Sequence, residues 1–501
     1  MLVFVVVFTA MNWQLSRNLM LPHGDSSMYE EHLWNLTHGK GFRSYLDQGL
    51  FPGEHVQVVH LGLLPAYWIW PSHLMLELCQ SLALASGAAP VFWLARRASA
   101  STRAASLLAV AYLLYPPMQF LDIAIDFKTF RPSAFGIPAI LFALDQFERG
   151  RIKTMLLCFV VALASQEDFA LVIGPLGLWI ALRPVLGQKL GEAADLLPPT
   201  MRDRRRAAIF GGALLLGSIA YFLTATRVVI PWFREGEELH YVRYFSKFGE
   251  GFGEVVLNML LKPGLLFSEL CSIPAGLYLL AVFVPLAFLP LLAPTRLAVA
   301  APLLMLLCLN EVVRSDPFPR HHFQAVIVPL LFWAAAGALK PRRESQWKLG
   351  RGRTPVFVAA LVCAASFMGT VTSAQNPLSL RFWDSGSVAY WRSNYVVSRR
   401  AELFERVFAV IPLTAKVAST DFVHPRFTHH ERSYDYSHYP RRVANYEDRV
   451  PDDTDFIVID TGHRYSDIKQ PQQLREMQRE PEKWEVLDIP TDGFFIVLKR
   501  R

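Results

Sequence analysis

Residues 21–60 read LPHGDSSMYEEHLWNLTHGKGFRSYLDQGLFPGEHVQVVH, a polar segment rich in acids and histidines between two strongly apolar segments. A segment with this many ionisable side chains does not cross hydrocarbon, so we expect it at a membrane face. Ionisable residues placed beside a membrane span usually have a function. The sequence therefore predicts that residues 21–60 carry functional groups at one surface of a membrane-embedded helical bundle.

The composition of the whole chain also indicates a membrane protein. Its 501 residues are 52% hydrophobic, with a mean hydropathy of +0.25, which is too apolar for an ordinary soluble enzyme. The net charge of +7 comes from short basic clusters between apolar segments, a pattern of membrane topology and not of nucleic-acid binding. The five cysteines lie in or beside apolar segments without a CxxC pair, so we expect neither a disulfide framework nor a cysteine-based zinc site.

Apolar segments long enough to span a membrane recur along the chain. A spanning helix needs about 20 largely apolar residues, and the pattern predicts about eleven such helices. The first lacks a basic leading region and a cleavage site, so we expect a retained span. Residues 61–71 are apolar but short and aromatic, which predicts a helix lying in the membrane interface. The expected spans are 2–21, 74–95, 104–121, 132–147, 152–165, 169–182, 207–226, 273–292, 297–309, 323–339 and 356–373.

The basic residues predict the orientation of the bundle. Basic loops stay on the cytoplasmic side of a membrane. With the spans above, the basic clusters all fall on one side: Arg96, Arg97 and Arg103; Arg149, Arg151 and Lys153; Arg202, Arg204, Arg205 and Arg206; Arg296; and Lys340, Arg342, Arg343, Lys348, Arg351 and Arg353. The acidic segment and all fourteen histidines fall on the opposite face or in the chain beyond it. This asymmetry predicts that the function lies on the outer face.

The chain changes character at about residue 374. Residues 387–410 have helical periodicity, 474–478 a short helical pattern, and four strand-like runs follow at 415–420, 455–460, 484–489 and 494–499. Alternating strands and helices predict a small α/β domain at 374–501, separate from a transmembrane bundle at 1–373. An odd number of spans places this domain outside the cytoplasm. Its glycines are isolated, so a phosphate-binding glycine loop is not expected.

Asp25 follows the first span directly and is the leading candidate for a catalytic base. A carboxylate at the membrane boundary can accept a proton from an acceptor hydroxyl, or hold a metal that does so. The alternative is that Asp25 caps a helix over residues 28–36, since Asp is a favoured N-cap residue. Glu30 and Glu31 follow on that helix, and we expect both to be solvated at the surface.

Two further groups contain acids or histidines on the outer face. His55 and His60, with Glu54, are candidate metal ligands, although their spacing does not match two ligands on one helical face. Glu167 and Asp168 interrupt two apolar segments, where acids are costly unless they serve a cavity. The alternative is that these acids only turn a helical hairpin. We favour a functional role, because Asn, Gly or Pro would turn the chain at lower cost.

Cations on the same face are candidates for binding a phosphate. Arg320, His321 and His322 directly precede a span, and Lys128 and Arg131 form a second such group. Cationic donors suit phosphate oxygens. The alternative is anchoring to lipid headgroups, which explains isolated basic residues better than the Arg-His-His run.

These residues resemble a known family. The pattern comprises Asp25, Tyr29, Leu33-Trp34-Asn35, Gly39, His60, Leu78, Gln80, Gly87, Pro90, Glu167-Asp168, His322 to Pro329, and the runs AKVAST (415–420) and DFIVID (455–460). It is similar to the bacterial polytopic membrane proteins catalogued as domain of unknown function 2079. That family is similar in architecture to the type C glycosyltransferases, which take sugars from polyprenyl-phosphate carriers.

The resemblance implies a site and a function. An acid in the first outer loop is essential in type C enzymes, which implies that role for Asp25. The residues after Asp25 are serines and not a second acid, so a divalent metal remains an alternative only. The leading hypothesis is a glycosyltransferase of the bacterial inner membrane. Asp25, Glu167 and Asp168 would be its catalytic residues, and its substrate-binding residues would be Arg320, His321, His322, Lys128, Arg131 and His60.

The partners expected for such an enzyme are membrane lipids, a polyprenyl-phosphate-linked sugar, and a glycan, lipid or protein acceptor of the envelope. Two alternatives come from other functional classes. A transporter or lipid flippase would need a site near the middle of the membrane, whereas the polar residues gather on one face. The other alternative is a non-catalytic envelope scaffold whose outer domain binds protein or glycan.

Overall fold

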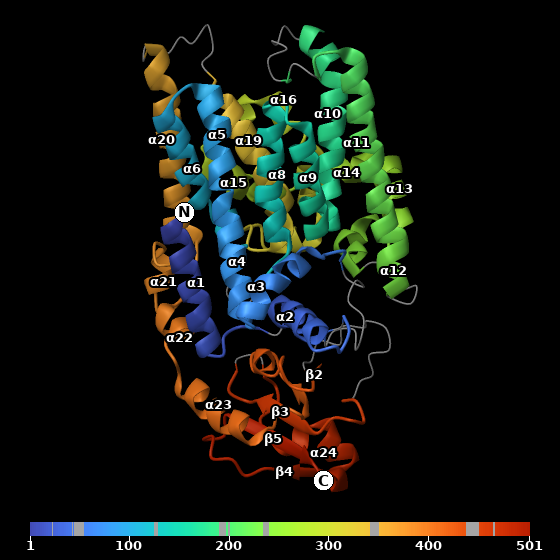
Figure 1. Ribbon diagram of the computed structural model, residues 1–501, viewed down its shortest axis with the longest axis vertical. Helices are drawn as coiled ribbons and strands as arrows, with labels where there is room; N and C mark the ends of the chain where they lie inside the picture. Colours follow the sequence, from blue (N-terminus) through green and yellow to red (C-terminus); the bar gives the residue numbers. More distant parts are fainter. Residues whose placement is uncertain are drawn as a thin grey trace.

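The structure of the protein is a computed structural model. It describes residues 1–22, 24–42, 44, 55–124, 129–189, 197–198, 201–233, 240–340, 350–436, 450–463 and 466–501, without the side chains of 24–25, 186–189, 240 and 350–353. The chain forms a long bundle of helices with a small sheet domain at one end (Figure 1). The helical fold and the C-terminal α/β character expected from the sequence are both confirmed.

The helices of the bundle follow the apolar segments of the sequence, and each of the eleven expected spans contains at least one helix. The main bundle helices are α1 (Leu2–Arg17), α4 (His73–Ser86), α5 (Ala88–Ser99), α6 (Thr102–Leu113), α8 (Ser133–Glu148), α9 (Ile152–Ser165), α10 (Ala170–Lys189), α11 (Arg204–Thr224), α15 (Ile273–Phe283), α17 (Ala301–Leu309), α19 (Val328–Ala338) and α20 (Gly350–Ser373). The interfacial helix expected at 61–71 corresponds to α3 (Leu64–Ile69) and the end of the preceding η1 (Val59–Leu63).

Fewer helices than expected are long and apolar enough to cross a membrane by themselves. Within the described residues, four meet this criterion: His73–Ser99, Glu167–Val185, Arg204–Phe233 and Thr354–Ser373. A fifth is added if Pro263–Leu270 and Ile273–Leu286, which meet at a bend of 51°, count as one span. The expected number of about eleven is therefore not established. The other apolar segments form helices that are shorter or interrupted.

The segment at 273–292 shows why a long apolar run need not form one helix. Helix α15 ends at Phe283 and is followed by two 3-10 turns, η7 (Val284–Leu286) and η8 (Leu289–Leu292). Pro285 and Pro290 lie in these turns, and proline removes a helical hydrogen bond. Between the turns, Ala287 and Phe288 have φ angles of 47° and 56°, outside the helical region.

The segment at 227–261, between the expected spans at 207–226 and 273–292, is partly helical in its described residues. It contains part of a π-helical turn, η5 (Ala225–Val229), then α12 (Ile230–Phe233), η6 (His240–Phe248) and α13 (Phe252–Leu261), and α14 (Pro263–Leu270) follows it. These helices are too short to be recognised as spans from composition. They pack on one another through a separate small hydrophobic cluster that includes Ile230, Val242 and Phe248.

The C-terminal sheet has five strands in the order β2-β1-β3-β5-β4. The bounds are β1 (Lys416–Ser419), β2 (Arg432–Asp435), β3 (Phe456–Asp460), β4 (Trp484–Val486) and β5 (Phe495–Arg500). Strand β1 is parallel to β2 and β3, whereas β5 is antiparallel to β3 and β4. The four expected strands are confirmed and β2 was missed. The expected helix at 387–410 is broken into α22 (Trp391–Tyr395) and α23 (Arg399–Val410).

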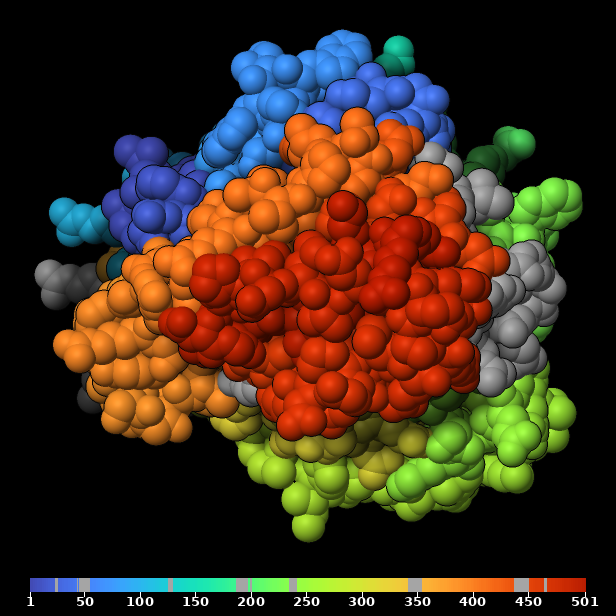
Figure 2. Space-filling view, turned by 90° about the horizontal axis from the view of Figure 1, so that it is seen from below, coloured from blue at the N-terminus to red at the C-terminus, as the bar shows by residue number. Residues whose placement is uncertain are grey.

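The C-terminal region covers one end of the bundle. Viewed from below, its orange and red surface occupies the middle of that end (Figure 2). After α20 ends at Ser373, residues as far as Tyr395 still pack in the hydrophobic cluster of the bundle. Arg400 then joins the end of α1 to the sheet: its guanidinium donates to the Leu19 carbonyl oxygen at 2.8 Å and contacts the Asp460 carboxylate.

The basic turns lie at the other end of the bundle. In Figure 1, the end of α5 and the short α16 (Pro294–Leu297) are at the top, and the sheet is at the bottom. Some of these cations are paired internally. Arg97 contacts Asp145 at 2.5 Å and Arg296 contacts Glu148 at 2.9 Å. These basic turns and the sheet domain therefore lie at opposite ends of the bundle.

Candidate functional site

Helix α2 (Gly24–Thr37) lies between the lower end of the bundle and the C-terminal sheet (Figure 1). The sequence predicted that Glu30 and Glu31 are solvated, and this is wrong, because both are almost completely buried. Their partners come from the C-terminal domain, about 400 positions away in the sequence, where no local pattern could indicate them. The helix is therefore an internal element with polar contacts on several faces.

The side chain of the leading candidate, Asp25, lies outside the described residues, and so does all of Lys128. The backbone of the helix nevertheless tests the alternative that Asp25 is its N-cap residue. Helix α2 begins at Gly24, four residues earlier than expected, so Asp25 lies in its first turn and not at the N-cap position. A carboxylate in the first turn still interacts favourably with the helix dipole.

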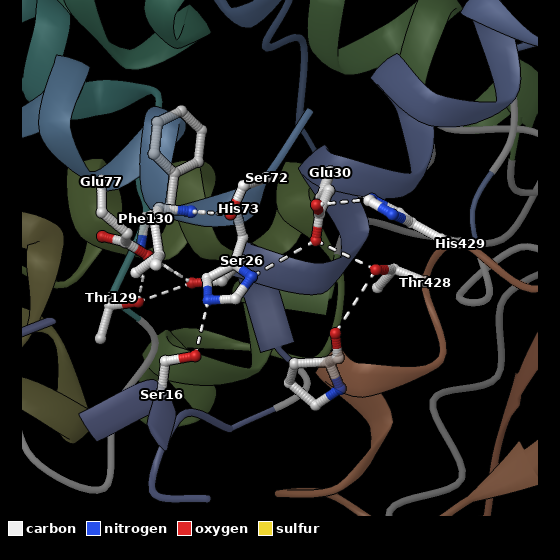
Figure 3. A network of polar contacts seen from close by, with 12 residues as sticks. Ser16, Ser26, Glu30, Ser72, His73, Glu77, Thr129, Phe130, Thr428 and His429 are labelled. Atoms are coloured by element: carbon white, nitrogen blue, oxygen red, sulfur yellow. Dashed lines mark hydrogen bonds and ion pairs between the residues drawn. The ribbon is translucent and has the colours of Figure 1, made fainter. Parts of the chain in front are cut away.

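Ser26, the residue after Asp25, is fixed by Glu77 of α4. The Ser26 hydroxyl lies 2.8 Å from Glu77 Oε1 and 2.6 Å from the hydroxyl of Thr129, which is itself 2.5 Å from the same carboxyl oxygen (Figure 3). The backbone N–H of Phe130 donates to Ser26 Oγ at 3.1 Å. The start of α2 is thus held against the segment that leads to Arg131.

Arg131 and His322 are in contact, although 191 positions separate them in the sequence. Arg131 Nη1 lies 2.6 Å from His322 Nδ1, and the Arg131 backbone N–H donates to Gln80 Oε1 at 2.6 Å. In the neutral tautomer that accepts at Nδ1, His322 carries its proton on Nε2. Two of the predicted phosphate-binding groups therefore form one donor-rich cluster beside the start of α2.

The rest of the Arg-His-His run lies close to this cluster. Burial lowers the pKa of His321, the positive charges of Arg131 and Arg320 lower it further, and Asp316 opposes them. Arg320 forms an ion pair with Asp316 at 3.6 Å. His321 is consequently a neutral hydrogen-bonding group at neutral pH, whereas Arg131 and Arg320 carry positive charges beside it.

Glu167 belongs to the same end of the bundle but has different partners. Its Oε1 lies 2.7 Å from His55 Nδ1, and its Oε2 accepts from the Val56 backbone N–H at 2.9 Å. Asp168 accepts a hydrogen bond from Gln166 at 2.7 Å. Both acids lie in η2 (Glu167–Phe169), between α9 and α10.

A chain of side chains connects this pair of acids with α2. Gln166 accepts from Gln57 at 3.2 Å, and Gln57 accepts a short hydrogen bond from the Tyr29 hydroxyl. The contacts thus link Glu167 and Asp168 to α2 through residues 55–57, and link Arg131 to α2 through Ser26. No direct contact between Glu167 and Arg131 or Arg320 is present among the described residues.

His60 packs inside the site and has lost its charge. Burial lowers its pKa to about 3, and His60 Nε2 lies 3.2 Å from His32 Nδ1. At neutral pH the His60 side chain is therefore uncharged and can form only neutral hydrogen bonds. His55, one of the three candidate metal ligands, contacts Glu167. In the described part of the chain no group of three or more His, Cys, Asp or Glu residues could hold a metal ion. Glu54 lies outside the described residues.

The C-terminal domain is attached to α2 by two acid–histidine contacts. Glu30 Oε1 lies 2.8 Å from His429 Nε2, and Glu30 Oε2 accepts from the Thr428 hydroxyl at 3.0 Å and lies 3.6 Å from His73 Nδ1 (Figure 3). Glu31 contacts His424 at 3.3 Å. The domain thereby covers the helix whose first turn contains Asp25.

The charge state of the Glu30–His429 pair depends on pH in a defined direction. Burial alone would raise the pKa of Glu30, but His429 and His73 together hold it well below its ordinary value of 4.5. Burial would lower the pKa of His429, but the charge and hydrogen bond of Glu30 and the charge of Glu31 raise it above 6.5. The Glu30 contribution to domain attachment is present above about pH 4.5, and the His429 contribution is complete below about pH 6.5 and lost as the pH rises through its folded pKa.

We therefore expect the C-terminal domain to be attached more tightly at about pH 6 than at about pH 9. Amide hydrogen exchange in β1 and β2 measures this attachment. After correction for the faster intrinsic exchange at high pH, the amides should be less protected at about pH 9 than at about pH 6. Glu30→Gln should remove most of the pH dependence. Equal protection at both pH values in the wild type would contradict the role assigned to the ion pair.

Glu77 of α4, which organises this site, was not predicted from the sequence as a site residue, and Gln80 was recognised only as part of the family pattern. Glu77 and Gln80 are completely buried, and Gln80 also donates to the Thr129 carbonyl oxygen at 2.8 Å. One signal was available: a Glu and a Gln three positions apart in an otherwise apolar span lie on one helical face. Asp122, whose Oδ1 accepts from the Ser81 hydroxyl at 2.9 Å, was also not singled out.

The comparisons with known proteins agree with this architecture. A family model described as "Predicted membrane protein (DUF2079)" matches residues 17–495. The chain is similar in fold to ArnT from Cupriavidus metallidurans, a type C glycosyltransferase. ArnT bound to undecaprenyl phosphate is matched over 99% of this chain and 97% of ArnT, with a TM-score of 0.52 and 13% sequence identity. ArnT in the apo state is matched over the same shares with a TM-score of 0.49. No curated protein matches the chain.

Proposed function

Because the chain belongs to the DUF2079 family of predicted membrane proteins and shares its fold with a type C glycosyltransferase, we propose that it is a glycosyltransferase of this class. Its donor would be a sugar linked to a polyprenyl phosphate that arrives from the bilayer. Its acceptor would be a hydroxyl group of an envelope glycan, lipid or protein. The reaction would take place outside the cytoplasm of a bacterium, at the face of the inner membrane that carries the C-terminal domain.

One observation carries the proposal: Arg131 and His322 meet beside the start of α2, close to the charge of Arg320 and to the neutral side chain of His321. Asp316 supplies a nearby negative charge, and it pairs with Arg320. A phosphate oxyanion would accept hydrogen bonds from the arginine and histidine donors and offset the positive charge. ArnT was crystallised with undecaprenyl phosphate, an anion of this kind on a lipid.

The proposed reaction is a displacement at the anomeric carbon of the sugar. The acceptor oxygen bonds to that carbon, and the bond from the carbon to the phosphate oxygen breaks, with its electron pair leaving on the phosphate. Asp25 takes the proton of the acceptor hydroxyl. Glu167 and Asp168 orient groups at the acceptor side, and His60 offers a neutral hydrogen bond. The residues proposed to hold the phosphate are Arg131, Arg320, His321, His322 and Lys128.

Binding of the carrier tests the phosphate site without knowledge of the sugar. We expect the purified protein in lipid nanodiscs to bind undecaprenyl phosphate, and Arg131→Met to weaken this binding by about tenfold to a hundredfold. The expectation follows because a hydrogen bond to a charged group contributes about 1.5–3 kcal/mol. Native mass spectrometry over a titration of the lipid measures the change.

An exposed arginine provides the matched control. Arg243 lies in η6 on the same side of the bundle and its side chain is exposed. Arg243→Met should change binding by less than about twofold, as expected for a screened surface charge. Undecaprenol, which lacks the phosphate, should compete poorly. If Arg131→Met bound the carrier as tightly as the wild type, or if undecaprenol competed as well as the phosphate, the phosphate site would be wrongly placed.

A further inference from the structure

Glu77 is in an unusual arrangement with two hydroxyl groups. Three oxygen atoms, Glu77 Oε1, Ser26 Oγ and Thr129 Oγ1, lie within 2.5–2.8 Å of one another and form a closed triangle. All three side chains are buried, with exposed fractions of 0% for Glu77, 1% for Ser26 and 2% for Thr129. The distances are those of O–H···O hydrogen bonds along each of the three edges.

Three hydrogen bonds among three oxygens need three hydrogen atoms. The hydroxyls of Ser26 and Thr129 each supply one. The Phe130 N–H also donates to Ser26 Oγ, but this is a separate hydrogen bond from the backbone. Its hydrogen therefore does not count toward the three edges of the triangle. An ionised Glu77 would leave one edge with two oxygen atoms facing each other at hydrogen-bond distance without a proton between them. A protonated Glu77 supplies the third hydrogen and closes the ring of bonds.

The second oxygen of Glu77 supports the same assignment. Oε2 is buried and has no hydrogen-bond partner in the described part of the chain. A buried ionised carboxylate needs hydrogen bonds or a counterion at both oxygens, whereas a neutral acid tolerates an unbonded carbonyl oxygen much better. The charge of Arg131 reaches Glu77 and favours its ionised form, but in the described part of the chain the guanidinium contacts His322 at 2.6 Å and forms no hydrogen bond with Glu77. Asp122 also approaches Glu77 closely enough to repel a negative charge there.

We propose that Glu77 is held as a neutral carboxylic acid and acts as a positioning residue that locks the start of α2 to the Thr129–Arg131 segment. The functional part of this inference rests on the proposed glycosyl transfer. The ring fixes Ser26, which is next to Asp25, and Thr129, which is two residues before Arg131 (Figure 3). One protonated side chain in α4 thus sets the distance between the predicted base and the predicted phosphate site.

The proton itself can be observed without any assay of function. Infrared spectra of the wild type should contain a carbonyl stretch of a protonated carboxylic acid that persists to alkaline pH, and Glu77→Gln should remove it. Asp122→Asn serves as the control, because that variant should retain the Glu77 band. If the wild type lacks a band that Glu77→Gln removes, Glu77 is ionised and the inference is wrong. This result does not depend on whether the protein transfers sugars.

Three variants test the positioning role. Glu77→Gln keeps a neutral side chain with a donor and an acceptor, so undecaprenyl phosphate binding should stay within about threefold of the wild type. Glu77→Ala removes the ring and should weaken binding by about tenfold or more. Glu77→Lys, which introduces a charge in place of a neutral group, should unfold most readily in a thermal melt. If Glu77→Gln binds as poorly as Glu77→Ala while both stay folded, the negative charge is needed and the inference fails.

Failure of the proposed function would give a different pattern. If the wild type does not bind the carrier at all, the phosphate site is wrong, but the infrared band and the order of melting temperatures would still establish the neutral Glu77. If the carrier binds and the band is absent, the proposed function stands and the role of Glu77 falls.

Discussion

Replacing Asp25 by Asn is expected to lower glycosyl transfer by about 10²–10⁴-fold, which is the usual contribution of a general base. The amide keeps the size and polarity of the side chain but cannot accept the proton of the acceptor hydroxyl. Helix stability should hardly change, because Asp25 lies in the first turn of α2 and Asn is only slightly less favourable there. The measurement is the initial rate of transfer by variants of equal melting temperature.

Two observations would decide how this result is interpreted. Asp492→Asn replaces an exposed acid of the C-terminal domain and should leave the rate unchanged, so it controls for a general loss of negative charge. Binding of undecaprenyl phosphate to Asp25→Asn should stay close to that of the wild type, since the base acts on the acceptor. A rate near that of the wild type for Asp25→Asn would assign Asp25 a structural role only.

Replacing Arg400 by Met is expected to destabilise the attachment of the C-terminal domain by about 3–5 kcal/mol, because breaking a buried ion pair leaves an uncompensated charge. Arg400 and Asp460 are 8% and 1% exposed. The guanidinium also donates to the Leu19 carbonyl oxygen at the end of α1, so the loss affects both the sheet and its junction with the bundle. Urea unfolding followed by proteolysis of the domain measures the change.

The neighbouring arginine provides a matched control. Arg399 pairs with Asp492 at 3.3 Å and with Glu402 at 3.7 Å, but its side chain is more than half exposed. Arg399→Met should change stability by at most about 1 kcal/mol. Adding Asp460→Leu to Arg400→Met should recover part of the lost stability, because the buried charge is then removed as well. Equal effects of the Arg399 and Arg400 substitutions would contradict this account.

The bundle and most of the sheet could be predicted because their signals are local. Apolar runs located a helix in every expected span, and short strand-like runs located β1, β3, β4 and β5. Interrupted helices were harder, because Pro285 and the left-handed residues after it break an apolar run without changing its composition. Strand β2 is short and polar, and it is defined mainly by its parallel partner β1.

The candidate site was only partly predictable, because its contacts join distant parts of the chain. The residue types of Arg131 and His322, and their place on the outer face, indicated each of them separately as a phosphate-binding candidate. Only the fold brings Arg131 Nη1 to within 2.6 Å of His322 Nδ1. Glu30 was read as a surface residue because its partners, Thr428 and His429, are in the C-terminal domain. The only sign in the sequence that Glu77 is buried is that it is an acid within an apolar span.

The most direct test of the proposed function is the release of the carrier. The wild-type protein in nanodiscs is incubated with a panel of polyprenyl-phosphate-linked sugars and an extract of envelope acceptors, and free polyprenyl phosphate is measured by mass spectrometry. We expect release from at least one donor. This release should depend on the acceptor and should be nearly abolished in Asp25→Asn. Binding of the donors without release from any of them, or release at the same rate by Asp25→Asn, would contradict the proposed function.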